Sequence, residues 1–393
     1  MPVIELGLKF DRSGEMSCMI NRQIRSVGSF LVALILLSPS THTHAAQVDW
    51  KKDWEQTVAA AKKEGQVAVY IYRYESVLQE FKRDFPDINV VSVTGRSTDL
   101  TNRVMSERRA GKFIADVYSS GPGGNVNVLY KGKALDPIKP LLSLPEVVDE
   151  SKWYGKEHRY ADPEGKHVFA YLAKGSDTQL AFNSGLVNPK EIKSYWDLTQ
   201  SKWKGKIVSL DPRDGGLGGA MQFFYYNPDL GPEFIKKFFG TMDAQFSRNF
   251  RQITDWLAQS RYAVCFGCKD SMKAKHQGLP VEDFETTKWK EGASFTAGGG
   301  SLSFLNQAPH PNAAKVFINW FLSRRGQIAL QKLGDVDEPP NSRRIDIPKD
   351  DVPPANRLAP HGKYFDVIKP EYSEVKPVAD LIKEIMTANE AKK

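Results

Sequence analysis

Apolar residues in the first part of the chain recur at two spacings, which predicts helices and strands in alternation. Trp54, Val58 and Ala61 are spaced as on one helix face before Gly65, and a β-branched and aromatic run at 66–72 follows as a strand. The same pattern predicts helices at 76–85, at 98–110 and from 125, with strands at 88–94 and 115–120. This alternation is typical of an α/β fold with a mostly parallel sheet.

A proline-rich stretch at 133–155 interrupts the alternation, and a second α/β set begins beyond it. The pattern predicts a strand pair at 167–183, helices at 194–203, from 221, at 252–260 and at 270–278, and strands at 205–211 and 262–266. A glycine-rich strand at 292–307, a helical pair at 311–334 and a helix from Val375 complete the chain. We therefore expect lobe 1 at 47–175, lobe 2 at 176–296, and a return to lobe 1 with C-terminal helices at 297–393.

The N-terminal residues have the pattern of a secretory signal peptide. Arg22 and Arg25 precede an apolar run at 30–37, and small residues follow up to Ala46. A run of this length is shorter than the about 20 residues that span a hydrocarbon core, although a short membrane anchor is the alternative. We expect residues 1–46 to be cleaved and the remaining chain to be exported to the periplasm.

Charge and length narrow the class of protein. Beyond residue 46 the chain keeps 50 Lys and Arg against 44 Asp and Glu, a mild and well mixed excess that permits an anionic ligand. The sequence shows no basic cluster with interleaved aromatic residues, which argues against nucleic acid as a partner. The length exceeds one typical hydrophobic core and predicts two lobes.

Two cysteines, Cys265 and Cys268, remain beyond the leader, and three interpretations of this Cys-x-x-Cys pair stay open. A zinc site needs four ligands, and His276 is the one close candidate partner. A redox couple fits the start of a helix, where a thiolate is stabilised. A structural pair, reduced or bridged in an oxidising compartment, is the interpretation we favour.

Motifs of hydrolytic enzymes are absent from the sequence. It holds no H-E-x-x-H, no G-x-S-x-G and no convincing Ser-His-Asp order, and its histidines are scattered. We therefore expect a non-catalytic binding protein without a cofactor. An exported thiol oxidoreductase that uses Cys265 and Cys268 is the less favoured alternative.

Four segments along the chain together resemble the periplasmic solute-binding proteins of ABC importers, of type II, in the group that includes ferric-ion binders. They lie at 107–121, 194–212, 278–295 and 308–334. The resemblance implies two lobes joined by crossing strands, a small solute in the cleft between them, and a permease partner in the inner membrane. It also implies a monomer, and the glycine-containing stretches 173–178 and 296–301 suit the crossings, where a hinge absorbs changes in backbone dihedral angle.

Ligands of open α/β sheets lie beyond the carboxyl ends of the strands, and this rule selects the candidate site. The residues that follow the predicted strands, and that we expect to bind the ligand, are Tyr72, Arg73, Tyr74, Arg96, Ser97, Thr98, Ser119, Ser120, Arg213, Gly218, Gly219, Gly267, Cys268 and Lys269. We predict no metal ligand among them.

The chemistry of these residues favours an anionic solute such as a carboxylate, phosphate or phosphonate. Helix N-termini favour anions, and the guanidinium groups of Arg73 and Arg96 can each bind a carboxylate or phosphate through two hydrogen bonds. The alternative is that each arginine is a surface side chain paired with a nearby acid. Iron(III) is the alternative ligand that the resemblance implies. Ferric binders place adjacent tyrosines near the strand end where this chain has Cys265–Cys268, which weighs against iron bound by phenolates.

Overall fold

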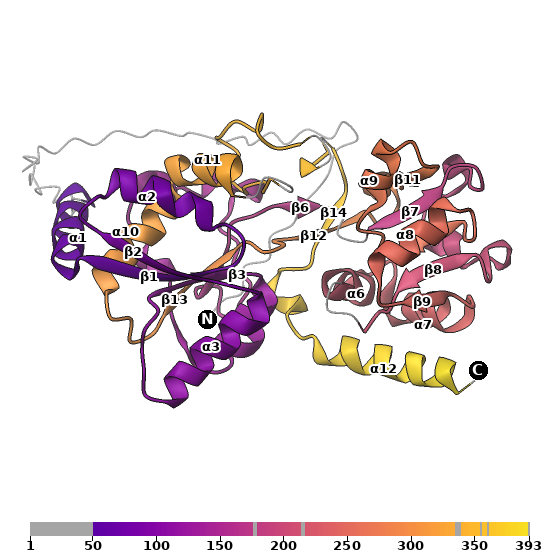
Figure 1. The fold of residues 1–393 in the computed structure, drawn as a ribbon, viewed down its shortest axis with the longest axis horizontal. Coiled ribbons are helices and arrows are strands. Elements are labelled where there is room, and N and C mark those ends of the chain that lie inside the picture. The colour runs from indigo at the N-terminus through magenta and orange to yellow at the C-terminus, as the bar shows by residue number, and fades with distance from the viewer. Residues whose placement is uncertain are drawn as a thin grey trace, which may run out of the picture. The chain divides into compact units, whose positions relative to one another are not determined.

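Two β-sheets, each flanked by helices, organise the part of the chain that the structure describes, and a third small sheet joins them (Figure 1). The computed structural model describes residues 50–175, 179–213, 217–334, 339–353, 356–359 and 361–391. The signal peptide predicted at 1–46 lies outside these residues. None of the described helices is long and apolar enough to cross a membrane.

The first sheet has the strand order β2-β1-β3-β13-β4, and β5 also pairs with β13. The strands are β1 (Gln66–Ile71), β2 (Asn89–Thr94), β3 (Val117–Ser120), β4 (Leu135–Asp136), β5 (Val168–Ala170) and β13 (Ser301–Leu305). β1 is parallel to β2 and β3, whereas β13 is antiparallel to β3, β4 and β5. The sheet is therefore mixed, and the prediction of a mostly parallel sheet is corrected, because a strand from late in the chain enters its middle in the antiparallel direction.

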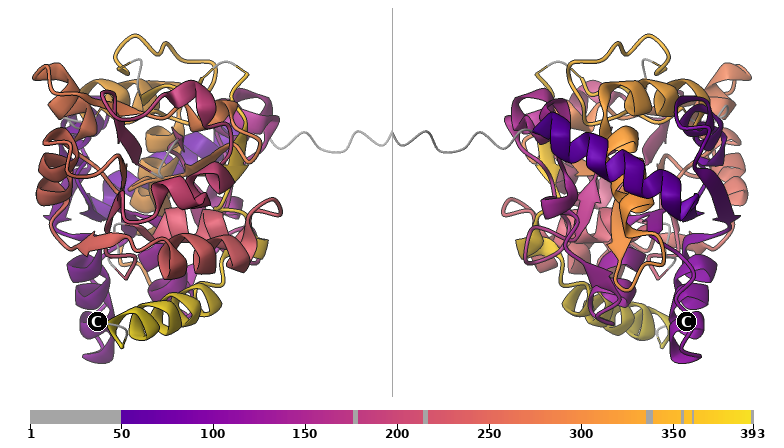
Figure 2. Two further views of the ribbon diagram at one scale, coloured as in Figure 1. Left: turned by 90° about the vertical axis from the view of Figure 1, so that its right-hand side faces the viewer. Right: turned by 90° about the vertical axis from the view of Figure 1, so that its left-hand side faces the viewer.

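The helices that cover this sheet are α1 (Trp50–Glu64), α2 (Leu78–Asp84), α3 (Ser97–Arg109), α4 (Pro122–Gly124), α5 (Pro145–Val148), α10 (Pro311–Leu322) and α11 (Arg324–Leu333). Together with the sheet they form what we call the first lobe. α1 lies beside α10 (Figure 2), and the Glu64 carboxylate accepts hydrogen bonds from the backbone N–H groups of Asn312 and Ala313. One carboxylate thus caps the start of α10, which favours negative charge there.

A buried carboxylate connects three distant segments of the first lobe. Asp116 is 0 % exposed and accepts hydrogen bonds from the backbone N–H of Ala68 at 2.7 Å and of His310 at 2.8 Å. The Nδ1 atom of His310 lies 3.0 Å from the same carboxylate. The start of α10 is therefore held against the sheet by polar contacts rather than by apolar packing alone.

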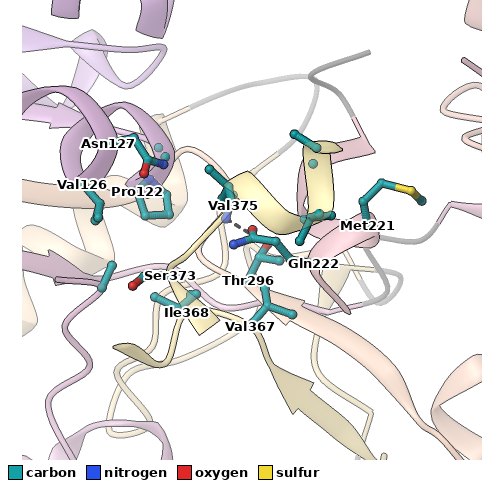
Figure 3. Close-up of a pocket in the computed structure, with 18 of the residues that line it drawn as sticks. Pro122, Val126, Asn127, Met221, Gln222, Thr296, Val367, Ile368, Ser373 and Val375 are labelled. Atoms are coloured by element: carbon teal, nitrogen blue, oxygen red, sulfur yellow. Dashed lines mark hydrogen bonds between the residues drawn. The ribbon is translucent and has the colours of Figure 1, made fainter. Parts of the chain in front are cut away.

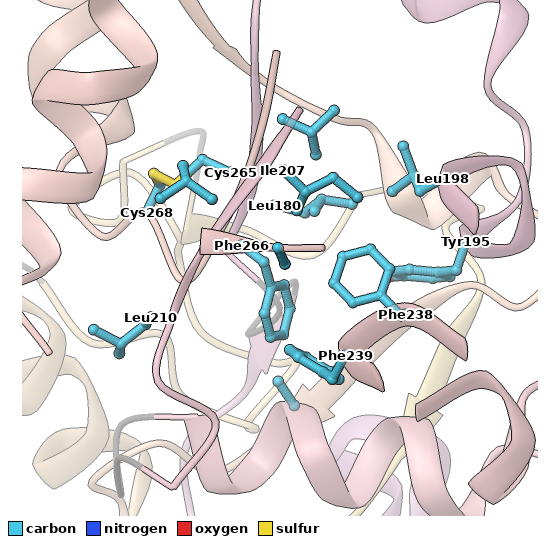
Figure 4. Close-up of a cluster of buried hydrophobic side chains, with 14 of the residues drawn as sticks. Leu180, Tyr195, Leu198, Ile207, Leu210, Phe238, Phe239, Cys265, Phe266 and Cys268 are labelled. Atoms are coloured by element: carbon cyan, nitrogen blue, oxygen red, sulfur yellow. A yellow bond between two sulfur atoms is a disulfide. The ribbon is translucent and has the colours of Figure 1, made fainter. Parts of the chain in front are cut away.

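The second sheet has the order β11-β7-β10-β8-β9. Its strands are β7 (Leu180–Asn183), β8 (Ile207–Leu210), β9 (Gln245–Ser247), β10 (Val264–Phe266) and β11 (Val281–Asp283), and its helices are α6 (Gly218–Tyr226), α7 (Gly231–Thr241), α8 (Phe250–Ala258) and α9 (Ser271–His276). These elements form the second lobe. Its core is rich in aromatic rings, among them Tyr195, Phe238, Phe239 and Phe266 (Figure 4). The second sheet is mixed as well, since β7 is antiparallel to β10 and β11.

The third sheet, with the order β14-β12-β6, joins the two lobes. Its strands are β6 (Lys174–Gly175), β12 (Ala293–Thr296) and β14 (Tyr364–Asp366). The expected α/β fold with two lobes and crossing strands is confirmed, and both predicted crossings contribute to this sheet, although 176–178 lie outside the described residues. The third crossing, β14, was not predicted, because a three-residue strand has too short a pattern to recognise.

The C-terminal helix α12 (Lys376–Glu390) differs from the expected domain organisation. β13, α10 and α11 belong to the first lobe, whereas α12 packs on α7 and α6 of the second lobe. Its buried residues Val378, Ile382, Ile385 and Met386 belong to the second lobe's core. The assignment of 297–393 as a whole to lobe 1 is therefore corrected, because the apolar face of α12 matches the second core.

Candidate ligand-binding site

A cavity of about 530 Å³ opens between elements of both lobes (Figure 3). Its lining comes from the chain after β3, from the chain after β8 with the start of α6, from β12, and from the segment between β14 and α12. The first two sources are carboxyl ends of strands, where ligands of α/β sheets lie. The volume falls within the range of about 300–1,000 Å³ that is usual for small-molecule sites.

The first-lobe wall of this cavity begins just beyond two predicted site residues, Ser119 and Ser120. Both are buried; the Ser119 hydroxyl lies 2.9 Å from the Tyr171 hydroxyl, and the Ser120 carbonyl accepts a hydrogen bond from Ser301 Oγ. The cavity lining starts at the next residue, Gly121, and continues into α4. The serines therefore hold the strand end in place, and the loop that follows them faces the cavity.

The second-lobe wall contains three predicted site residues, Arg213, Gly218 and Gly219. Arg213 donates from Nε and Nη2 to the Asp211 carboxylate at 2.9 and 2.8 Å, and from Nη1 to Glu390 at 2.9 Å. These hydrogen bonds, first to Asp211 and then to Glu390, raise the pKa of Arg213. Burial opposes ionisation of Asp211, yet its bonds to Arg213 hold the pKa of this carboxyl below its usual range. The Arg213 charge is thus largely balanced within the protein.

The C-terminal segment forms a third wall that the sequence did not predict. Val375, Val378, Ala379 and Ile382 line the cavity from one face of α12 and its first turn. The segment is fixed to α6 because Gln222 Nε2 donates to the Tyr372 carbonyl at 3.0 Å and the Tyr226 hydroxyl donates to the Glu374 carbonyl. A helix from the end of the chain therefore shapes the cavity.

A smaller cavity of about 80 Å³ lies beside the larger one, and Gly298 lines both. Two predicted site residues, Arg73 and Tyr74, line it together with Lys174 of β6. Arg73 has a backbone φ of 69°, in the left-handed region that residues other than glycine rarely adopt. Its guanidinium lies 5.9 Å from the ring centre of Tyr72, the remaining predicted residue of this loop.

The other predicted residues lie at strand ends but not in the lining of these two cavities, as far as the described residues show. Arg96 is the N-cap of α3 and is exposed, as is Thr98, while Ser97 is half-buried. The carbonyl of Ser97 accepts a hydrogen bond from the Tyr118 hydroxyl at 3.1 Å. Lys269 is exposed and lies over the Phe250 ring. These residues follow the carboxyl ends of strands, and their role in binding stays a prediction.

Cys265 and Cys268 form a disulfide bond within the core of the second lobe (Figure 4). Cys265 is 0 % and Cys268 is 1 % exposed, so the bridge is inaccessible to solvent. Gly267 between them has a φ of 82°, and a Cβ atom there would lie 2.7 Å from Leu210 Cβ. The turn after β10 therefore needs glycine at this position, and neither Gly267 nor Cys268 presents a side chain to a ligand.

Several cavity residues were missed by reasoning from the sequence. Pro122 lies two residues and Asn127 seven residues beyond the end of β3, Gln222 lies twelve residues beyond the end of β8, and Val367 and Ser373 belong to the connection into α12. Pro122 is close enough to its strand end to follow from the strand-end rule, whereas Asn127 and Gln222 lie within the helices that follow. Val367 and Ser373 carry no local signal, because only the tertiary fold brings them to the cavity.

Comparisons with known proteins agree with this architecture. A family model of bacterial extracellular solute-binding proteins matches residues 76–343. An uncharacterized protein of Haemophilus influenzae is 25 % identical over an alignment of 237 residues, which covers 54 % of this chain and 60 % of that relative. The chain thus spans about 60 % of the length of the curated relative that it matches.

Solved structures match over most of the chain. The periplasmic binding protein AfuA from Actinobacillus pleuropneumoniae, with fructose-6-phosphate bound, is 19 % identical and has a TM-score of 0.56, covering 82 % of this chain and 98 % of its own. Iron-bound HitA from Pseudomonas aeruginosa is 16 % identical with a TM-score of 0.56, covering 81 % and 99 %. FutA from Trichodesmium, in complex with iron and citrate, is 19 % identical with a TM-score of 0.60, covering 82 % and 99 %.

These structural matches establish the two-lobed fold of periplasmic binding proteins, and the family model covers more than half of the sequence. The chain therefore belongs to the family of bacterial extracellular solute-binding proteins.

Proposed function

We propose that this protein captures a small organic solute in the larger cavity and delivers it to the membrane permease of an ABC importer. The observation that supports this most directly is the cavity of about 530 Å³, which elements of both lobes line at the carboxyl ends of β3 and β8. Membership of the solute-binding family makes capture without chemical conversion the natural use of such a cavity.

The third sheet supplies the hinge that capture by closure requires. Phe295 and Thr296 of β12 pair with Gly175 and Lys174 of β6, and the glycines 298–300 follow directly. A Cβ atom at Gly300 would lie 2.1 Å from Leu172 Cγ, so only glycine fits at this position. Short strands beside glycines absorb a change in dihedral angle at small cost, which suits movement of one lobe against the other.

The smaller cavity supports an anionic group on the solute. Arg73 and Lys174 both line it, and it adjoins the larger cavity at Gly298. Two cationic side chains on a cavity with backbone and amide groups favour a carboxylate or a phosphate at that end. A solute that extends from one cavity into the other would place its anionic end near β6.

The alternative ligand and the alternative enzymatic function have less support. No group of three or more His, Cys, Asp or Glu that could hold a metal ion occurs among the described residues. A thiol oxidoreductase needs an accessible sulfur, whereas the sulfurs of Cys265 and Cys268 are bonded to each other and buried. We therefore carry forward solute binding alone.

The remaining expectations extend this proposal. Export to the periplasm by a signal peptide at 1–46, a monomeric state and docking on an inner-membrane permease all follow if the chain works as the binding component of an importer. The family's extracellular location is consistent with the disulfide, since such bonds persist in oxidising compartments.

A pair of matched variants tests solute binding at this cavity. Ala379 and Ala388 are both exposed on α12, nine residues apart, which places them on opposite faces of a helix with 3.6 residues per turn. Ala379 lines the cavity and Ala388 does not, among the residues described. The variant Ala379→Trp fills the cavity, and Ala388→Trp adds the same ring elsewhere.

The measurement is a calorimetric and thermal-shift screen of the chain from residue 47 against fructose 6-phosphate, phenyl phosphate, benzoate and ferric citrate. We expect at least one solute to raise the melting temperature, because a ligand that binds only the native state stabilises it. Ala379→Trp should abolish that shift, and Ala388→Trp should retain it. A shift of equal size in both variants would show that the solute binds outside this cavity.

A further inference from the structure

We infer that the larger cavity accommodates an organic solute whose main body is apolar, such as an aromatic or branched aliphatic acid. This inference rests on the proposed solute-binding function and narrows the class of solute. Three observations carry it: the side chains of the lining, the balance of charge within the lining, and the volume.

Most side chains that line the larger cavity are aliphatic. The first lobe contributes Pro122 and Val126, the second contributes Met221, and the C-terminal segment contributes Val367, Ile368 and Val375 (Figure 3). Apolar side chains thus come from all three walls. A solute that removes such surface from water gains about 25 cal/mol for each Å² that becomes buried.

The polar side chains of the lining are neutral or already engaged. Arg213 is the one charged side chain in the described lining, and Asp211 and Glu390 accept hydrogen bonds from its Nε, Nη1 and Nη2 atoms. Gln222 donates to the Tyr372 carbonyl, and Thr296 Oγ1 accepts from the backbone N–H of Gly298 at 3.1 Å. These groups orient a solute without providing an unbalanced charge that would hold a bare inorganic ion.

The cavity, with the lobes as they stand in this structure, is larger than a small ion needs. A cavity of about 530 Å³ corresponds to roughly 18 water molecules at about 30 Å³ each. An inorganic anion would leave most of this space filled with water against aliphatic side chains. A body of one or two rings, or of comparable branched chains, displaces that water and contacts several walls together.

The test compares solutes that share an anionic group and differ in their apolar body. The chain from residue 47 is titrated in a calorimeter with acetate, benzoate and 1-naphthoate, and with inorganic phosphate and phenyl phosphate. We expect 1-naphthoate to bind at least about tenfold more tightly than acetate, and phenyl phosphate more tightly than phosphate. The heat capacity change of binding should become more negative as the apolar body grows.

Two variants locate the effect. Val375→Thr replaces one methyl group by a hydroxyl of similar shape on the half-buried cavity wall, and should weaken the binding of 1-naphthoate several-fold more than the binding of acetate. Ala379→Asp should weaken 1-naphthoate at least about tenfold, and Ala388→Asp, on the opposite face of α12, should leave its affinity within about twofold. Circular dichroism of each variant confirms that it is folded.

Other outcomes would overturn the inference in distinguishable ways. If the chain binds only inorganic phosphate, fructose 6-phosphate or ferric citrate, solute binding stands and the apolar class is wrong. If 1-naphthoate binds equally well to Ala379→Trp, its site lies outside the cavity and the inference is wrong. If the folded chain binds none of these probes, both the inference and the proposed function fail.

Discussion

The two lobes are built on similar alternating patterns and both have aromatic-rich apolar cores, but they differ in the contacts that supplement those cores. In the first lobe, buried polar side chains such as Asp116 and Asn125 bridge segments that are far apart in the sequence. In the second lobe, the core is rich in aromatic rings, as the first is, but it also contains one disulfide bond and a helix from the C-terminal part of the chain. A buried polar side chain must keep its hydrogen-bond partners in one geometry, whereas apolar side chains can repack. We therefore expect the stability of the first lobe to be the more sensitive to single substitutions.

The largest expected effect is the loss of the Asp116 carboxylate. Asp116→Ala would leave the backbone N–H groups of Ala68 and His310 without an acceptor in a buried place. We expect a loss of about 3–5 kcal/mol in the free energy of unfolding, measured by urea denaturation. The control is Asp136→Ala, which removes an exposed carboxylate from β4 of the same sheet. Equal losses in the two variants would contradict the role of the buried carboxylate.

The next effect concerns the helix that completes the second lobe. Ile385 is 8 % exposed within the second core, and Ile385→Ala should cost about 3 kcal/mol. Hydrogen exchange should accelerate in β7, β8 and β10 and remain near the wild-type rate in β1 and β3. Substitution of the neighbouring exposed residue, Glu384→Ala, should neither lower the stability nor accelerate hydrogen exchange. Faster exchange in the first lobe would show that α12 stabilises both lobes equally.

A smaller loss is expected from removal of the disulfide. Its two cysteines are separated by 3 positions in the sequence, so the bond closes a very short loop and restricts the unfolded chain only slightly. The variant Cys265→Ala/Cys268→Ala should be less stable by about 2 kcal/mol. A reducing agent should destabilise the wild type and leave the double variant unaffected. A loss much above this value would mean that the sulfurs contribute mainly through packing.

The smallest effect is a pH dependence in the first lobe. Burial lowers the pKa of His158 below its usual value of 6.5, and its Nε2 lies 2.8 Å from the Val147 carbonyl. Below pH 6.5 the unfolded chain therefore binds a proton that the native state does not, so this histidine destabilises the fold as the pH falls. Wild-type stability should decline between pH 6.5 and 5.5 more steeply than that of His158→Gln, by at most about 1.4 kcal/mol. If the stability of the wild type and of His158→Gln changed with pH in parallel, this role of His158 would be contradicted.

The parts of the fold that were predictable have local signals. The strand runs at 66–72 and 205–211 and the helix at 98–110 correspond to β1, β8 and α3, since each has a clear period and a clear stop. The two-lobed fold followed from their order and from the family resemblance. The packing of α12 did not follow, because its amphipathic pattern shows that one face is buried and not which core covers it.

The candidate site was predictable only in outline. The strand-end rule found the loops of Arg73 and Arg213, and residues of both line cavities. The rule could not show that Asp211 and Glu390 balance the charge of Arg213, because Glu390 lies 177 positions away in the sequence. Nor could it find Val375 or Ala379, whose place in the cavity depends on how the C-terminal segment crosses between the lobes.

The late position of β13 and α12 has a consequence for how the polypeptide is made. β13 enters the middle of the first sheet beside β3, where Ser301 meets a residue 181 positions earlier, and the second core still lacks Ile385 and Met386 at that stage. Neither core is complete until most of the chain has left the ribosome, and pairing over such distances is slow. The family works outside the cell, and slow completion of both cores would suit a chain that is exported before it folds.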